Sequence, residues 1–147
     1  GCCPTFWTSF GSNCYRFFAV SLTWAEGEQF CQSFSVPSRG DIDSIGHLVS
    51  IHSETEQNFV YHYFETSTKD DTTPEMWLGF NDRTTEGNFQ WTDGSPNDFT
   101  AWVGSNPDNY GSGEDCTQMV MGAGLNWIDL PCSSTRHYLI CKLPLWE

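Results

Sequence analysis

Basic side chains are scarce in this sequence of 147 residues. Six Lys and Arg stand against nineteen Asp and Glu, which gives a formal net charge of -13 at pH 7. Nucleic acids and anionic membranes attract proteins through a basic footprint, so this balance argues against both as partners. A protein that binds cations would instead lose part of its self-repulsion when it binds them.

Long apolar runs are also absent. No stretch approaches the roughly 18 consecutive apolar residues of a membrane-spanning helix, so we expect no membrane insertion. The sequence starts at Gly1 without a Met or a signal-peptide pattern, and we expect a mature, processed chain. Its length suits a single domain over residues 1–147, large enough to bury a core.

The Cys-x-x-Cys pairs typical of zinc sites are missing, although the chain contains seven cysteines. The four His residues do not lie at ligand spacing from these cysteines, so zinc is the weaker explanation. Seven cysteines in a chain of this size indicate disulfides and an oxidising, extracellular setting. Because the number is odd, at least one thiol has no partner within the chain.

A catalytic constellation is missing as well. No Ser/His/Asp order and no activated cysteine stands out. A glycosidase would need two carboxylates about 5 to 9 Å apart, and the chain has many acids. However, they cluster with Asn, Gly and Pro in one loop, which suits a metal ion better than an acid/base pair. We therefore expect no enzyme.

That loop is the segment 106–116, which reads Asn-Pro-Asp-Asn-Tyr-Gly-Ser-Gly-Glu-Asp-Cys. It combines three carboxylates and two carboxamides with flexible glycines and a cysteine that could anchor its end. Calcium takes six to eight oxygen ligands at about 2.3 to 2.6 Å from such groups. The alternative is a solvated acidic loop. Residues 93–113 contain little that favours regular structure, and a long stretch of this kind in a compact domain is usually functional.

Two capping boxes predict where helices start. In Thr23-Trp24-Ala25-Glu26 and Ser53-Glu54-Thr55-Glu56, the hydroxyl and the last carboxylate can each satisfy a free amide of the first turn. Apolar or alternating runs predict strands within residues 6–20, 47–51, 77–80, 89–92, 116–121, 126–128 and 137–142. This order favours an α+β architecture, in which an antiparallel sheet carries the long loop.

Taken together, these features resemble the C-type lectin domain. The motifs that carry the resemblance run through most of the chain: Cys3-Pro4, Cys14-Tyr15, Cys31, Leu48-Val49-Ser50-Ile51, Trp77-Leu78-Gly79, Gly113-Glu114-Asp115-Cys116, Trp127-Ile128-Asp129-Leu130-Pro131-Cys132 and Cys141. The resemblance implies a C-type lectin-like fold, with two helices packed on antiparallel sheets, an N-terminal hairpin and a long calcium-binding loop. The additional N-terminal cysteine of a stand-alone domain is most similar to the secreted invertebrate body-fluid lectins.

The resemblance also implies how the cysteines pair. Cys3–Cys14 would close the N-terminal hairpin, Cys31–Cys141 would join the first helix to the last strand, and Cys116–Cys132 would brace the acidic loop. Cys2 remains. Such a thiol in a secreted protein commonly links to another chain, so we expect an inter-chain disulfide at Cys2 and a homodimer or larger oligomer. The alternative is a Cys2 capped by a small thiol.

A sugar-binding calcium site in the long loop is a further implication. In sugar-binding members, the proline that corresponds to Pro107 is cis and turns the flanking side chains toward one ion. The amide-then-acid order of Asn106-Pro107-Asp108 is similar to that of galactose-binding members of the family. This order decides which hydroxyl of a vicinal pair on the sugar meets a hydrogen-bond donor and which meets an acceptor. The implied calcium ligands are Asn106, Asp108, Glu114 and Asp129, and the implied sugar contacts are these four residues and Tyr110.

Two residues qualify this site. Tyr110 lies where galactose-binding members carry a ring that packs on the apolar face of the sugar; the alternative is an aromatic residue packed inward. The family strand that usually reads Trp-Asn-Asp is here Trp127-Ile128-Asp129. Ile128 offers no oxygen, so one ligand and one sugar-bonding amide are missing, and water or sugar hydroxyls would have to complete the shell.

A second, structural calcium position of the family is better matched. Its implied ligands are Asp82, Glu86, Asn109, Glu114 and Asp115. This ion would hold the long loop in shape, and Glu114 could bridge both ions.

The sequence therefore predicts a secreted, calcium-dependent lectin of the extracellular fluid. It would bind galactose-type terminal glycans and agglutinate by multivalent cross-linking in innate defence. The alternative hypothesis is a cell-adhesion or protein-binding domain of the same fold without sugar binding. It rests on Ile128 and on Arg39-Gly40-Asp41, a tripeptide that resembles integrin-recognition motifs and would engage a cell-surface receptor.

Overall fold

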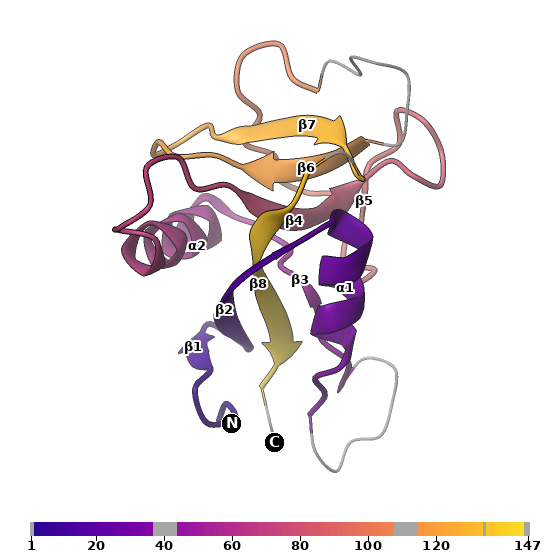
Figure 1. Cartoon of the computed structure of the whole chain (residues 1–147). Coiled ribbons are helices and arrows are strands. Elements are labelled where there is room, and N and C mark those ends of the chain that lie inside the picture. The colour runs from indigo at the N-terminus through magenta and orange to yellow at the C-terminus, as the bar shows by residue number, and fades with distance from the viewer. Residues whose placement is uncertain (1, 37–43, 108–114, 134, 146–147) are drawn as a thin grey trace.

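The computed structural model describes residues 2–36, 44–107, 115–133 and 135–145. Within them it contains two helices and eight strands, labelled in Figure 1. In chain order these are β1 (Thr8–Phe10), β2 (Asn13–Leu22), α1 (Trp24–Gln32), β3 (His47–Leu48), α2 (Glu54–Ser67), β4 (Met76–Asn81), β5 (Gln90–Trp91), β6 (Asp115–Met119), β7 (Trp127–Pro131) and β8 (His137–Pro144). The expected α+β fold class is confirmed.

The sheet is mixed, whereas an antiparallel one was expected. Its order is β1-β2-β8-β4-β6-β7, with β3 paired to β8 and β5 paired to β4. The C-terminal strand β8 lies between β2 and β4, antiparallel to β2 and parallel to β4. Because β8 returns alongside β2, its C-terminal end lies beside the N-terminal hairpin (Figure 1), where the Leu145 amide donates to the Ser12 carbonyl at 3.2 Å. This return fixes β4 near the centre of the sheet, where it also pairs with β5, the strand that precedes the long loop.

Both helices start at the predicted caps, but the second cap differs in detail. At α1 the two arms of the capping box are present: Glu26 N donates to Thr23 Oγ1 at 3.4 Å, and Thr23 N donates to Glu26 Oε1 at 3.0 Å. At α2, Glu56 N donates to Ser53 Oγ at 3.1 Å, but Glu56 Oε1 accepts from the amide of His52, one residue before the cap, at 2.8 Å. The other carboxylate oxygen accepts from a buried lysine.

That lysine is Lys142 on β8, which is 8% exposed. Its ammonium group donates to Glu56 Oε2 at 2.7 Å and to the backbone oxygen of Ser50 at 3.0 Å. The Tyr15 hydroxyl donates to the same Glu56 oxygen. Burial, reinforced by Glu56, raises the pKa of the Tyr15 hydroxyl, so it remains a protonated donor. The network joins β2, β8 and the start of α2 beneath the aromatic core.

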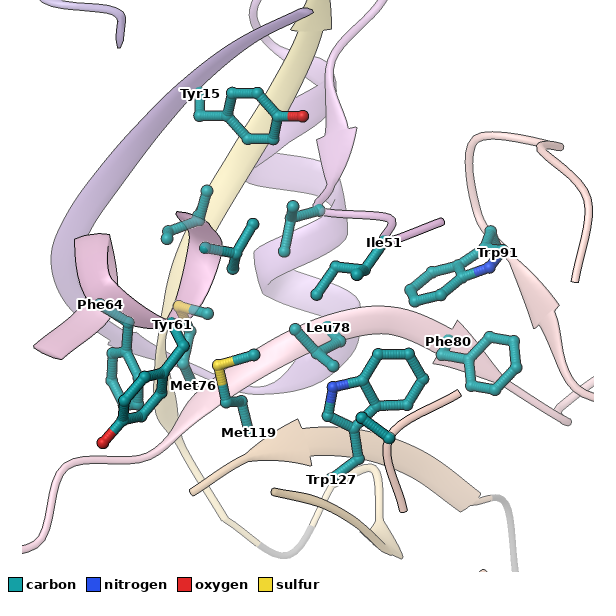
Figure 2. Packing of buried hydrophobic residues seen from close by; sticks show 14 of the residues in the cluster. Tyr15, Ile51, Tyr61, Phe64, Met76, Leu78, Phe80, Trp91, Met119 and Trp127 are labelled. Atoms are coloured by element: carbon teal, nitrogen blue, oxygen red, sulfur yellow. The ribbon is translucent and has the colours of Figure 1, made fainter. Parts of the chain in front are cut away.

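The core is built from large side chains of β4, β6, β7 and α2. Figure 2 shows Leu78, Phe80 and Trp127 facing one another between the sheet strands, with Phe64 of α2 at one side. Trp127, Phe64 and Leu78 have no exposed surface. Burying one such side chain contributes about 1.5 to 3 kcal/mol, so this cluster supplies the rigid base on which the loops are built.

Three disulfides reinforce this base. Cys3–Cys14, Cys31–Cys141 and Cys116–Cys132 have S–S distances of 2.04, 1.98 and 2.02 Å, and they are the three pairs that the resemblance implies. Cys2 is free and exposed. None of the helices in the described parts of the chain is long and apolar enough to cross a membrane.

A second buried carboxylate holds α1 against the sheet. Glu28 on α1 accepts from the Leu48 amide at 3.0 Å and lies 2.7 Å from His47 Nδ1. Burial by itself would lower the pKa of His47, but the hydrogen bond and charge of Glu28 outweigh it and raise that pKa. His47 is therefore held in its protonated form to a higher pH in the folded chain than in the unfolded chain.

We expect Lys142→Ala to lower the free energy of unfolding by about 3 to 5 kcal/mol, because it leaves the Glu56 carboxylate buried without its cation. Chemical denaturation measures this loss. Arg136→Ala is the control, since it removes an ion pair to Glu26 in which both side chains are about half exposed and should change stability by at most about 1 kcal/mol. Equal losses for the two variants would contradict the role given to the buried pair.

His47→Gln should destabilise the fold more at pH 6 than at pH 9. Because the pKa of His47 is higher in the folded chain, its protonated imidazole stabilises the fold at pH values below the unfolded-state pKa of about 6.5. This stabilisation disappears as the pH rises through the folded-state pKa. Denaturant titrations at the two pH values test the difference. Gln32→Met is the control, because Gln32 donates to the same Glu28 carboxylate at 2.7 Å through a neutral amide. The destabilisation caused by this substitution should therefore be the same at both pH values.

Candidate functional site

An acidic cluster forms where β4 ends and β6 begins. These strands are antiparallel neighbours with Asn81 opposite Cys116, so the residue after β4, Asp82, meets the first residue of β6, Asp115. The Asp82 amide donates to the Asp115 carbonyl at 3.3 Å. Glu86 joins them from the following loop, and one oxygen of each carboxylate lies within 4.8 Å of the others.

The loop that carries Glu86 is shaped by its own backbone. The Gly87 amide donates to Asp82 Oδ2 at 2.9 Å and to Glu86 Oε2 at 3.2 Å. Gly87 has a φ of +82°, a left-handed conformation that glycine adopts without steric cost. The carboxylates of Asp82 and Glu86 therefore accept from the same amide, which holds them next to each other.

Asn81 fixes the base of this loop, and sequence reasoning missed it. Its side-chain nitrogen donates to the carbonyls of Gly79 and Gln90, both at 3.2 Å, and its Oδ1 accepts from the Arg83 amide at 3.2 Å. An Asn that follows an apolar strand and precedes an acid is typical of a residue that caps a turn. That signal was present in Phe80-Asn81-Asp82.

The cluster fits a hard divalent cation. Asp82 is only 5% exposed, and its Oδ1 is buried without a hydrogen-bond partner among the described residues. A buried carboxylate oxygen in this state is costly, and nearby carboxylates repel one another. All three groups offer oxygen and none offers nitrogen or sulfur, which is the donor set that suits calcium. Of the predicted ligands of the structural ion, Asn109 and Glu114 lie outside the described residues.

The second predicted site is described only in part. Asn106 and Pro107 are joined by a cis peptide bond. The Asn106 side-chain nitrogen donates to the Val103 carbonyl at 2.7 Å, so the amide is oriented by a turn of its own loop. Asp108, Tyr110 and Glu114 lie outside the described residues, as do Arg39, Gly40 and Asp41.

The remaining predicted ligand, Asp129, lies on β7 opposite Thr117 of β6 and is 9% exposed. The segment before Asn106 is attached to the same strand: the Val103 amide donates to the Trp127 carbonyl, and the Trp127 amide donates to the Ala101 carbonyl, both at 2.9 Å. β7 therefore supports both Asp129 and the loop that presents Asn106. Ile128, between Trp127 and Asp129, is half-buried.

The aromatic rings of Trp91, Trp102 and Trp127 pack together as a floor beneath this loop. The Trp127 ring lies 5.6 Å from Trp91 and 5.9 Å from Trp102, edge to face. Its indole nitrogen donates to Gln57 Oε1 of α2 at 3.0 Å. The floor is thus anchored to the helix on the other side of the core.

Comparison with known proteins agrees with this architecture. A family model described as the lectin C-type domain matches residues 20–143. The chain is 40% identical over 139 residues to an alpha-N-acetylgalactosamine-specific lectin of Patiria pectinifera, an alignment that covers 93% of this chain and 77% of that protein.

Among solved structures, the C-type lectin CEL-I from Cucumaria echinata is 36% identical and has a TM-score of 0.87, covering 97% of this chain and 98% of that one. A calcium-independent type II antifreeze protein is 32% identical with a TM-score of 0.75, covering 97% of this chain and 95% of that one. The same fold therefore occurs in a protein described as a lectin and in one described as independent of calcium.

Proposed function

The chain belongs to the C-type lectin domain family, and we propose that it is a secreted, calcium-dependent lectin for galactose-type sugars. The observation that carries the calcium dependence is the cluster of Asp82, Glu86 and Asp115, with its buried carboxylate oxygen. The relative from Patiria pectinifera is described as specific for alpha-N-acetylgalactosamine, which supports the galactose class.

The proposed ligands belong to two calcium sites. Asp82, Glu86 and Asp115 would hold a calcium ion that fixes the start of β6 against the loop after β4, and with it the end of the long loop. Asn106 and Asp129, with Asp108 and Glu114, would hold the ion at the sugar site. A bound calcium ion supplies positive charge that attracts the lone pairs of two sugar hydroxyls. The amide and carboxylate side chains orient those hydroxyls by donating to one and accepting from the other.

Ile128 sets the strength of the proposed site. Its side chain is hydrocarbon, so it gives the ion no oxygen and the sugar no amide. We propose that sugar hydroxyls or water take this place, with weaker binding at each site. Several linked sites on one particle would then be needed for agglutination, because linked sites gain avidity. A disulfide-linked dimer through the exposed Cys2 is the simplest way to link two sites.

A protein-binding function is the second candidate. It is favoured by Ile128, which weakens the sugar site, and by the fold's occurrence in a protein described as calcium-independent. In this case Arg39-Gly40-Asp41 would contact a cell-surface receptor. Arg39→Ala separates the two candidates, because it should leave haemagglutination unchanged and reduce cell spreading. Neither candidate gives the acids an acid/base role, so we propose no catalytic role.

Calcium should raise the melting temperature of the protein, because an ion that binds only the folded state stabilises it by mass action. Asp82→Asn should abolish this rise. In excess chelator the same variant should melt at the wild-type temperature or above it, because it removes one of three mutually repelling carboxylates. Thermal unfolding with and without calcium measures both effects. A variant that still gains stability from calcium would exclude Asp82 as a ligand.

Galactose and N-acetylgalactosamine should inhibit agglutination at lower concentrations than mannose, and chelator should abolish agglutination altogether. Asn106→Ala should weaken sugar binding about tenfold or more, because it removes a ligand oxygen and a hydrogen-bonding amide together. Titration calorimetry with each sugar measures the loss. Thr100→Ala, an exposed position in the same loop, is the matched control. Sugar binding that persists in chelator would refute the calcium mechanism.

A further inference from the structure

The long loop starts at a hydrogen-bond chain that leads from the protein interior. Ser50 has no exposed surface, and its hydroxyl accepts from the Lys142 ammonium group at 3.0 Å and donates to Asp93 Oδ2 at 2.5 Å. Burial by itself would raise the pKa of Asp93, but the hydrogen bonds from Ser50 and Ser95 and the charge of Lys142 outweigh it and lower that pKa. The first residue of the long loop is therefore an ionised anchor, held by the segment between β3 and α2.

A second contact from the same segment reaches further into the loop. His52 Nδ1 lies 2.7 Å from Asp98 Oδ1, although the two residues are 46 positions apart in the sequence. The exposed fractions of the two side chains are 22% for His52 and 47% for Asp98. A pair with one partner about half exposed contributes little to the stability of a whole fold. We call this contact between His52 and Asp98 the clasp.

The hydrogen-bond partners of His52 show where its ring hydrogen lies. Nε2 is buried and has no hydrogen-bond partner among the described residues. An ionised carboxylate only accepts, so in its neutral form the ring carries its hydrogen on Nδ1 and donates it to Asp98. The ring also packs edge to face on Trp91 of the aromatic floor, with centroids 5.8 Å apart. The floor thus holds the ring, and the ring presents one N–H group to the loop.

Short links connect the clasp to Asn106, the predicted ligand of the sugar site. Four residues after Asp98, the Trp102 ring packs on Trp127 at 5.9 Å. The next residue, Val103, donates its amide to the Trp127 carbonyl at 2.9 Å. Asn106 in turn donates to the Val103 carbonyl from its backbone nitrogen at 3.0 Å and from its side-chain nitrogen at 2.7 Å. A displacement at Asp98 therefore has few bonds to cross before it reaches Asn106.

We propose that His52 is a positioning residue of the sugar site: through Asp98 it holds the first half of the long loop where Asn106 can bind the ion and the sugar. His52 itself touches neither. Binding groups must be held within about 0.5 Å of their productive positions, so the loss of one loop contact lowers affinity without unfolding the protein. The inference rests on the proposed function and deepens it, because a residue behind the aromatic floor would then set part of the sugar affinity.

Two amide side chains of different reach test the clasp. In His52→Asn the amide nitrogen is as many bonds from the backbone as Nδ1, so it can donate to Asp98. In His52→Gln the nitrogen is one bond further out, as Nε2 is. Both substitutions remove the ring from Trp91, so the comparison isolates the hydrogen bond to Asp98. Titration calorimetry with N-acetylgalactosamine in calcium should give a dissociation constant about fivefold or more higher for His52→Gln than for His52→Asn.

Substitutions of the partner complete the set. Asp98→Ala should weaken sugar binding as His52→Gln does, whereas Asp98→Asn keeps an acceptor oxygen and should bind like the wild type. His62→Gln is the matched control, because His62 Nδ1 lies 3.5 Å from Glu65 in an exposed pair of the same kind on α2. It should leave the sugar affinity unchanged.

Two further measurements separate positioning from a merely structural role. Chemical denaturation should give the same free energy of unfolding for His52→Asn and His52→Gln. Hydrogen exchange of the Val103 amide should be faster in His52→Gln, because the loop is no longer held on one side.

Equal sugar affinities of the two His52 variants overturn the proposal. So does a loss of affinity in His52→Gln that is matched by an equal loss of global stability. A wild type that binds no sugar in calcium refutes the proposed function instead. The Val103 exchange rates then decide whether the clasp orders the loop: faster exchange in His52→Gln upholds it, and equal exchange in the two variants overturns it.

Discussion

The pairing of β4 with β6 is the constraint on which the candidate site depends. It places Asp82 and Asp115 side by side, although they are separated by more than thirty residues in the sequence. The Cys116–Cys132 disulfide begins at the next residue and ties this corner to the end of β7. Because Asp115 is the first residue of β6, which follows the long loop in the sequence, a cation bound at the cluster would act directly on the end of that loop.

The same corner explains why carboxylates can be buried here. Asp82 and Asp115 are buried, whereas Glu86 is exposed. The two buried carboxylates would repel each other in a low-dielectric setting unless a cation or several donors compensated them. Elsewhere the chain solves this problem with its own cations: Lys142 compensates Glu56, and His47 compensates Glu28. At Asp82 the Gly87 amide donates to one carboxylate oxygen, and the other oxygen is buried without a hydrogen-bond partner among the described residues. The contrast between these buried acids is the strongest physical support for a cation site.

Charge is distributed unevenly along the chain, and the distribution separates two kinds of surface. Residues 1–25 contain no Asp or Glu and include the exposed Cys2, while the long loop and the loop after β4 carry much of the negative charge. β1 and β7 are opposite ends of the main strand order. A dimer formed at the β1 end would therefore leave the candidate sugar sites at β7 free on both copies, an arrangement that suits cross-linking of particles.

Local sequence determined the elements whose signals are local. The capping box at Thr23 and Glu26, the apolar strand at Trp77 to Phe80 and the helix that starts after Ser53 are formed by neighbours in the chain, so their patterns could be interpreted without a structure. The cysteine pairs and the acids Asp82, Glu86 and Asp115 were identified through a resemblance to a family. Composition alone did not determine which cysteines pair or which acids cluster, because both depend on contacts between segments that are distant in the sequence.

Tertiary structure decided the rest. The Glu56 carboxylate was predicted to accept from the amide of the cap residue Ser53. In the structure its Oε1 accepts from the amide of His52, one residue earlier, and its Oε2 accepts from Lys142, 86 residues later, in a buried place. Asn81 became a loop anchor only because the carbonyls of Gly79 and Gln90 lie within its reach. The parallel β4–β8 pair likewise arises from segments distant in the sequence. A pattern in the sequence specifies what a residue can bond to, whereas packing decides which of those partners comes close enough.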